Sequence, residues 1–191
     1  MDTELLYSKF PELMTDRLIL RQIVPDDYTA LFDIFSRPEV TSYYNLDTFQ
    51  TTDPAKALVD SFIRRFHDRR GIRWGIVSKA NSKLIGTCGL QNLVDQHSRA
   101  EIGYDLRPDF WRSGIMSEAI KEVLRFCFKE ILLNRIEALC MPGNNASISL
   151  LKKYNFQIEG TVRQFTYWKG QYHDLVLLSL LHSECKLDSS G

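Results

Sequence analysis

The chain has 191 residues, of which 44% are hydrophobic and 12% aromatic, enough to fill the core of one domain. Its 24 basic residues balance 24 acidic ones, and this zero net charge argues against direct nucleic-acid binding, which normally needs a basic excess. The acidic start MDTELLYSKF lacks the apolar core of a secretory signal, and no apolar run approaches the roughly 20 residues of a membrane helix.

The cysteines and histidines predict no metal centre. Cys88, Cys127, Cys140 and Cys185 form no CxxC pair, and three of them lie inside apolar segments. None of the four histidines stands at metal-ligand spacing from another. We therefore expect buried free thiols in a cytoplasmic protein, without a bound metal and without membrane contact.

The first predicted strand covers residues 15–23, where Leu18 and Leu20 share one face. A helix should follow, because Pro25 suits a first turn, and Pro38 should end or kink this helix.

A second helix is predicted within residues 51–71. Asp53 is its expected cap, Pro54 suits its first turn, and Gly71 suits a left-handed stop. Its basic residues lie largely off the apolar stripe, and we interpret them as a solvated face. They are Arg64, Arg65, Arg69 and Arg70.

Three strands follow as a meander. Residues 73–79 and 84–93 form a predicted hairpin, and residues 99–106 form the third strand. Strand alternation places Glu101, Gly103 and Asp105 on one face of this third strand and Ala100, Ile102, Tyr104 and Leu106 on the other.

The second half of the chain adds a long helix with a sustained 3.6-residue period, from about Ser117 to about Ile131. A strand over residues 134–141, a short helix between Asn144 and Asn155, and two last strands near residues 156–165 and 174–181 complete the prediction. The strand, helix and strand across residues 99–141 make a βαβ crossover, which forces one parallel strand pair. The expected fold class is therefore α+β (mixed α/β), a mostly antiparallel mixed sheet of about seven strands flanked by about four helices.

The junction RPDFWRSGIMSEA joins a strand to the long helix. Backbone N–H groups in the first turn of a helix have no helical partner and together carry about half a positive charge. Gly114 permits a tight turn, Arg112 adds a full charge, and Ser113 and Ser117 add hydroxyl donors. These features predict an anion cradle suited to a phosphate or pyrophosphate, although a plain helix entry would contain the same residues.

A second junction, MPGNNASISLLKKYNF, also enters a helix directly after a strand. Asn144 and Ser147 stand three residues apart, so ordinary helix capping is one interpretation. Both junctions, however, follow the C-terminal ends of adjacent parallel strands, where ligands settle in open α/β sheets. Two polar helix starts side by side can hold an elongated anionic ligand.

Together these segments resemble the GNAT superfamily of acetyl-CoA-dependent N-acetyltransferases, and more narrowly its ribosomal-protein alanine N-acetyltransferase branch. The resemblance covers about residues 15–181. It is carried, in order, by TDRLILRQIVPDD, LIGTCGL, RAEIGYDLRPDFWRSGIMSEA, NNASISLLKKYNF with FQIEGTVR, and YHDLVLLSL.

The resemblance implies a three-layer fold in which acetyl-CoA lies between two splayed strands. Its pantetheine arm would run beside the strand that ends at Leu106, and Asn144 would meet that arm. Its pyrophosphate would bind the backbone of the first junction. The residues implied there are Arg112, Ser113, Gly114, Ile115, Met116 and Ser117.

The chain departs from the family pattern at three positions. Trp111 stands where the loop commonly has Gln or Arg, and Met116 where it has Gly or Ala. Backbone N–H groups do most of the binding in such a loop, so we expect binding to survive. Leu151 occupies the position of a tyrosine that acts as general acid in many members, and Tyr154 lies about one turn further on.

The resemblance implies direct attack of a neutral amine on the thioester, with a base to remove a proton and an acid for the leaving thiolate. Glu101 is the candidate base, although an ordinary salt bridge is its alternative role, and Asp105 is a second choice. Ser147 is the candidate acid, with a first-turn helix donor as its alternative. Glu118 at the helix start should stabilise the helix dipole.

The predicted protein is thus an N-acetyltransferase acting on a primary amine, either a protein N-terminus as in the ribosomal-protein branch or a small molecule. His173 could line the substrate mouth. Loops with aromatic residues would flank the acceptor cleft, at Tyr43, Tyr44, Phe165, Tyr167 and Trp168.

Two alternatives stay open at this point: a CoA-binding sensor or interaction module without turnover, and a structural domain without a nucleotide. We expect one domain over residues 1–182 and a disordered tail over residues 183–191. Edge strands often pair, so a homodimer is a further expectation.

Overall fold

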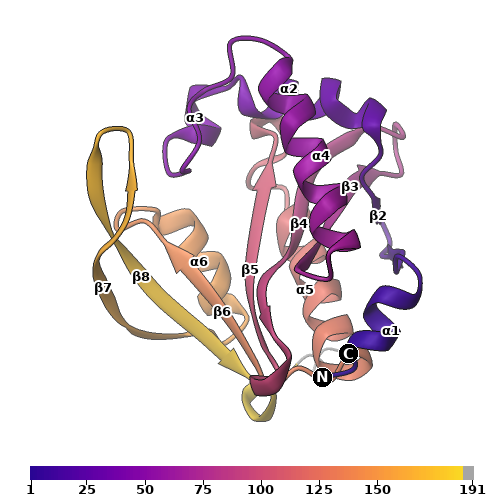
Figure 1. Cartoon of the computed structure of the whole chain (residues 1–191), viewed down its shortest axis with the longest axis vertical. Helices are drawn as coiled ribbons and strands as arrows, with labels where there is room; N and C mark the ends of the chain where they lie inside the picture. Colours follow the sequence, from indigo (N-terminus) through magenta and orange to yellow (C-terminus); the bar gives the residue numbers. More distant parts are fainter. Residues whose placement is uncertain (187–191) are drawn as a thin grey trace.

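One mixed sheet forms the middle of the protein, as the computed structural model, which describes residues 1–186, makes plain (Figure 1). Its eight strands lie in the order β1-β2-β3-β4-β5-β6-β8-β7, and β5 with β6 is a parallel pair. The strands are β1 Leu13–Met14, β2 Leu18–Gln22, β3 Gly71–Ser78, β4 Leu84–Val94, β5 Arg99–Leu106, β6 Arg135–Cys140, β7 Gln157–Trp168 and β8 Gln171–Leu181.

Helices cover both faces of the sheet. One hydrophobic core joins α2 and α4 to one face, and a second core joins α1, α5 and α6 to the other, so the predicted three-layer fold is confirmed. The α-helices are α1 Thr3–Ser8, α2 Tyr28–Phe35, α3 Pro38–Thr41, α4 Asp53–His67, α5 Ile115–Arg125 and α6 Asn145–Lys153.

The element count exceeds the prediction of about seven strands and about four helices. The extra strand, β1, has two residues, and the extra helices α1 and α3 have six and four residues. Helices this short have fewer than two turns, and a two-residue strand has at most one alternation between faces. The sequence of such segments therefore shows no hydrophobic period.

The ends of α4 differ from the prediction. Thr52 is its N-cap and Asp53 is its first residue. The helix ends at His67, and Arg69 rather than Gly71 takes the left-handed conformation, with φ of 56°. Gly71 instead opens β3, where a Cβ would lie 2.5 Å from the Leu90 carbonyl oxygen. This close approach is the reason that a glycine occurs there.

Helix α5 begins two residues before its predicted start, because Gly114 with φ of 78° forms the turn that directly precedes Ile115. Its apolar stripe is buried as expected, at Ala119, Ile120 and Val123 among others. The helix then widens into a π-helical turn over Phe126–Glu130.

Cys88, Cys127 and Cys140 are buried free thiols, as predicted. The predicted tail begins in a short 3-10 helix, His182–Glu184, and its residues 187–191 lie outside the described part of the chain. Within residues 1–186, no helix is both long and apolar enough to cross a membrane.

Candidate active site

The parallel strands β5 and β6 pair over only three residues and then separate. The last paired residues are Glu101 and Glu137, and beyond them the two strands diverge toward their C-terminal ends (Figure 1). Antiparallel pairing with β4 continues along the other edge of β5 as far as Leu106. The edge of β5 that faces the gap can therefore pair with an extended ligand.

Glu101 stands at the apex of this gap. Its Oε1 accepts a hydrogen bond from Gln91 Nε2 at 2.6 Å, and its Oε2 accepts one from Asn92 Nδ2 at 2.9 Å. Within residues 1–186 no salt bridge involves Glu101, and two neutral amides hold its carboxylate in place. Each oxygen keeps a lone pair for a further donor.

Asp105, the second choice for a base, is buried with an exposed fraction of 6%. It forms an ion pair with Arg73 and accepts a hydrogen bond from Thr87 Oγ1 at 3.2 Å. Burial raises the pKa of the Asp105 carboxyl, and Arg73 and Thr87 offset part of this. Because the Arg73 guanidinium stacks over Phe62 of α4, this pair belongs to the packing between α4 and the sheet.

Ser147 lies in the first turns of α6, on the opposite face of the sheet. Its Oγ shares a hydrogen bond with the Tyr104 hydroxyl at 2.7 Å and lies 3.4 Å from Cys140 Sγ. Burial raises the pKa of Tyr104, and the bond to Ser147 offsets part of the rise. Burial also raises the pKa of Cys140, and the charge of Glu101 adds to it. Cys140 therefore lies within electrostatic reach of Glu101 and in contact with Ser147.

The loop before α5 presents backbone N–H groups to solvent. Residues 111–114 are exposed, and the first helical hydrogen bond runs from Glu118 N to the Gly114 carbonyl at 3.0 Å. The N–H groups before Glu118 are therefore those that a helix leaves without a partner. A Cβ at Gly114 would lie 3.5 Å from Arg17 Nη2, which is an ordinary van der Waals contact.

The side chains of this loop are held by the protein itself. Ser113 Oγ donates to the Phe110 carbonyl at 2.6 Å, and Trp111 Nε1 donates to the Leu106 carbonyl at 2.8 Å. Ser117 Oγ accepts from Lys153 Nζ at 2.9 Å. The hydroxyl groups that the sequence suggested as ligand donors thus already have partners, whereas no group among the described residues accepts a hydrogen bond from the backbone N–H groups of residues 112–117.

Two further contacts fix the start of α5. Glu118 accepts hydrogen bonds from Thr15 Oγ1 at 2.5 Å and from Arg17 Nε at 2.6 Å, so it ties α5 to the chain before β2. Burial raises its pKa, but these hydrogen bonds outweigh burial and lower the pKa overall.

Tyr154 donates to the Ser117 carbonyl at 2.5 Å, which places it against the loop. Leu151, at the family position of the tyrosine acid, is fully buried.

Asn144 is the N-cap of α6, as the helix-capping interpretation predicted. Its Oδ1 accepts a hydrogen bond from Ser147 N at 3.2 Å, and no group within residues 1–186 accepts a hydrogen bond from its amide nitrogen.

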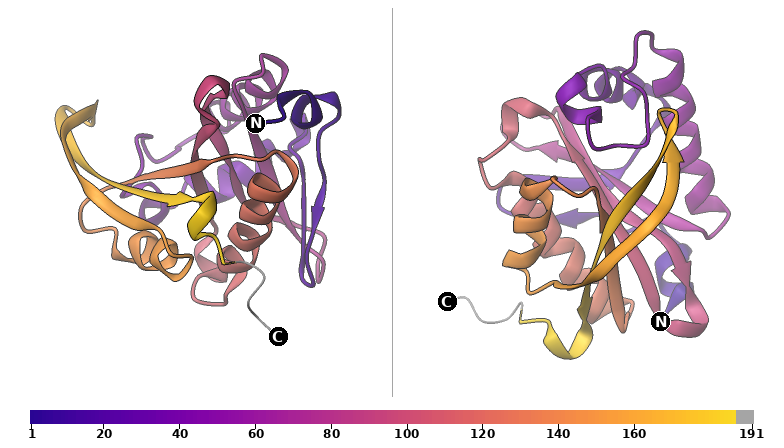
Figure 2. Two further views of the ribbon diagram at one scale, coloured as in Figure 1. Left: turned by 90° about the horizontal axis from the view of Figure 1, so that it is seen from below. Right: turned by 90° about the vertical axis from the view of Figure 1, so that its left-hand side faces the viewer.

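The β7–β8 hairpin reaches across the gap on the α2–α4 side. Lys169 Nζ at its tip donates to the Thr41 carbonyl of α3 at 2.9 Å, and Figure 2 shows the tip beside this segment. His173 stacks on Trp168 within the hairpin, with ring centroids 4.4 Å apart. Phe165 and Tyr167 are exposed there, whereas Tyr44 packs against Phe35.

The site thus combines an anion-binding helix start with an open strand edge. An elongated anionic ligand with a peptide-like arm fits both, because the arm can pair with β5 while its phosphates meet the N–H groups at Gly114.

The comparison with known families decides the identity of this arrangement. The family model described as "Acetyltransferase (GNAT) domain" matches residues 17–157, which include β5, the loop and α6. The chain belongs to the GNAT family of acetyltransferases. Members of this family use acetyl-CoA.

Similar proteins agree with this assignment to the GNAT family. The N-acetyltransferase YoaA of Bacillus subtilis is 43% identical over 172 residues, which cover 90% of this chain and 97% of YoaA. The N-acetyltransferase p20 of Bacillus licheniformis is 37% identical over the same shares. Among solved structures, a GNAT acetyltransferase from Bacillus anthracis has a TM-score of 0.80 at 23% identity and covers 91% of this chain and all of that one.

The sequence did not point to three side chains that lie at this candidate site. Tyr104 was assigned to the apolar face of β5, and its hydroxyl on that face was the available signal for a polar partner. Arg17 and Lys153 gave no signal, since their contacts with the loop depend on how distant segments pack. Within the described residues, no three His, Cys, Asp or Glu side chains gather as a metal site would need.

Proposed function

We propose that the protein transfers the acetyl group of acetyl-CoA to a primary amine, by direct attack of the amine within a ternary complex. The observation that carries this proposal is the position of two side chains at the divergence of β5 and β6. Glu101 faces the α4 side, and Ser147 reaches the gap from the α6 side. A base and an acid on opposite sides of the thioester suit a reaction that removes a proton on one side and stabilises a thiolate on the other.

The backbone of residues 112–117 would hold the pyrophosphate. Arg112, Ser113, Gly114, Ile115, Met116 and Ser117 contribute there, chiefly through N–H groups. The edge of β5 up to Leu106 would pair with the pantetheine arm, and the free amide of Asn144 would complete that contact. This arrangement would leave the thioester between Glu101 and Ser147.

Glu101 would accept the proton of the attacking amine, directly or through a water molecule. The amides of Gln91 and Asn92 orient its carboxylate. Ser147 would donate a hydrogen bond to the departing sulfur. Tyr104 keeps its proton because burial raises its pKa, so it can donate to Ser147 and leave the serine proton free for the thiolate. The thiol of cysteine has a pKa of about 8.5, and a thiolate of this kind is stable enough to leave with the help of one hydrogen bond.

The acceptor would be a protein N-terminal amine or a small-molecule amine. Two relatives in Escherichia coli are named for such acceptors: an L-amino acid N-acetyltransferase, 28% identical over 159 residues, and a ribosomal protein uS5-alanine N-acetyltransferase, 25% identical over 180 residues. The reaction would take place in the cytoplasm. The exposed outer strand β7 could support a homodimer.

A thiol-release assay with acetyl-CoA and a panel of amines tests the proposal. Amine-dependent release of CoA is the expected result. Tight binding of CoA in a titration without amine-dependent release would favour the alternative, a CoA-binding sensor or interaction module.

A further inference from the structure

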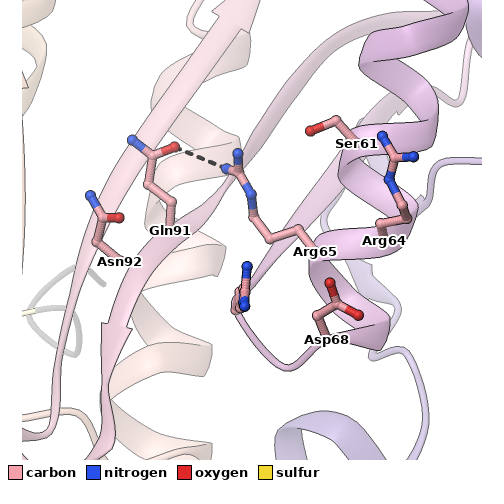
Figure 3. Close-up of a pocket in the computed structure, with 7 residues that line it drawn as sticks. Ser61, Arg64, Arg65, Asp68, Gln91 and Asn92 are labelled. Carbon is pink, nitrogen blue, oxygen red and sulfur yellow. Dashed lines mark hydrogen bonds between the residues drawn. The ribbon is translucent and has the colours of Figure 1, made fainter.

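A polar hollow opens on the α4 face beside Glu101, outside the cofactor gap. It has a volume of about 420 Å³. Side chains from α4, the turn after it and β4 line it, as Figure 3 shows. They include Arg64, Arg65, Asp68, Arg70, Gln91 and Asn92.

The hollow is connected to the candidate base by hydrogen bonds. Arg65 Nη1 donates to Gln91 Oε1 at 3.0 Å, and Gln91 Nε2 donates to Glu101 Oε1 at 2.6 Å. Figure 3 shows Arg65 reaching from α4 to Gln91 on the strand. The side-chain amide of Gln91 therefore separates the Arg65 guanidinium from Glu101, the carboxylate that would accept the proton of the amine. A positive and a negative side chain thus bind the same amide.

The position of Arg65 is built into the fold. A Cβ at Gly71 would lie 2.9 Å from Arg65 Cδ, so the glycine makes room for the arginine stem. The stem lies against the backbone where β3 begins, and the guanidinium is thereby directed across the hollow.

The other two arginines have their guanidinium groups available. Within residues 1–186, no ion pair or side-chain hydrogen bond involves the guanidinium of Arg64 or Arg70, whereas neighbouring Arg69 pairs with Glu4 at 2.6 Å. Three arginines and Asp68 line the hollow, and Glu101 lies behind Gln91 and Asn92. The lining therefore carries an excess of positive charge, with the Glu101 carboxylate bound to two of its amides.

We propose that this hollow binds a carboxylate of the acceptor, so that preferred acceptors carry an acid group close to the amine that is acetylated. Arginine suits this role, because its planar donors match carboxylate oxygens. The ammonium form of the acceptor would meet Glu101 while its acid group meets Arg64 and Arg70. The inference rests on the proposed acetyl transfer and narrows its acceptor class.

The carboxylate could belong to the side chain of a peptide acceptor or to a free amino acid, and matched pairs of acceptors distinguish these two sources. A C-terminally amidated peptide that begins Ala-Glu is compared with one that begins Ala-Gln, and free alanine is compared with alaninamide. The two peptides differ in one side-chain carboxylate, and for alanine and alaninamide, whose amines also differ in pKa, kcat/KM is expressed per neutral amine. We expect kcat/KM to be about tenfold higher for the acidic member of at least one pair, and this preference to fall with added salt.

The double variant Arg64→Gln/Arg70→Gln should abolish the preference through a rise in KM for the acidic acceptor. The control Lys83→Gln/Lys121→Gln removes the same charge from exposed positions elsewhere and should keep the preference. Thermal unfolding of both variants checks that they are folded.

The outcomes separate this inference from the proposed function. If no amine releases CoA, both are overturned. If acidic and neutral acceptors react equally well, or if the preference survives in Arg64→Gln/Arg70→Gln, the carboxylate subsite is overturned while acetyl transfer stands. A preference confined to the peptide pair or to the alanine pair supports the subsite and identifies its source.

Discussion

The hydroxyl of Tyr104 lies 2.7 Å from Ser147 Oγ, and this hydrogen bond joins the open edge of β5 to the start of α6. It links the two sides of the gap between the diverging strands at the level where the thioester would lie. The buried family position, Leu151, cannot supply a hydroxyl there. The hydroxyl pair of Tyr104 and Ser147 is the acid that we propose instead.

Replacement of Ser147 by alanine should lower kcat by about tenfold or more, with little change in KM for acetyl-CoA. The lost hydrogen bond acts mainly on the thiolate, which develops only in the transition state. Tyr104→Phe should have a smaller effect of the same kind, because the Tyr104 hydroxyl orients the serine without contacting the sulfur. Steady-state kinetics of both variants measure this, and an unchanged kcat in Ser147→Ala would remove the serine from the mechanism.

The Glu101→Gln variant should lower kcat at neutral pH by about 10²–10⁴-fold, since it removes the general base. Glu137→Gln is the matched control, because Glu137 lies opposite Glu101 on β6 and binds Arg99 at 2.8 Å and Arg135 at 2.7 Å. It should lower stability more than kcat. Full turnover in Glu101→Gln would show that another group receives the proton.

Gly114→Ala should weaken acetyl-CoA binding. Gly114 has φ of 78° and Gly170 has φ of 79°, so alanine strains both positions by about 1 kcal/mol. Only Gly114 lies in the loop whose N–H groups would hold the pyrophosphate, and an added Cβ there would hinder the close approach of an anion. Calorimetric titration with CoA should give a raised Kd for Gly114→Ala and the parent value for Gly170→Ala. Equal affinities would place the pyrophosphate elsewhere.

The ion pair of Arg73 and Asp105 should matter for stability and not for the base step. Asp105→Ala leaves the buried Arg73 charge without its partner, which should cost about 3–5 kcal/mol. The double variant Arg73→Met/Asp105→Leu should recover much of this loss. Urea unfolding measures both. A stable Asp105→Ala protein with little turnover would instead make Asp105 a catalytic group.

Glu159 should contribute to the acid sensitivity of the β6–β8–β7 side of the sheet. Hydrogen bonds from Arg135 and Ser179 lower its pKa from 4.5 to about 2. The folded pKa lies below the unfolded one, so the stabilisation is present above about pH 4.5 and is lost as pH falls toward 2. Glu159→Gln should flatten the stability profile in that window, and Arg135→Gln should do the same. An unchanged slope in both would assign the acid transition to other groups.

The sequence by itself determined the order of the longer strands and helices, the parallel crossover and the loop at Gly114. These features depend on local signals: apolar period, turn residues and the length of each segment. Glu101, Gly103 and Asp105 were correctly placed on one face of a strand for the same reason.

Only the tertiary structure decided which of those side chains a ligand can reach. Asp105 and Glu101 share a face, yet one is buried with Arg73 and the other is held by two amides at the apex of the gap. Tyr104 meets Ser147, and Arg65 meets Gln91, across elements far apart in the chain. Such contacts depend on strand register and on how helices pack over the sheet, and no local pattern in the sequence records them.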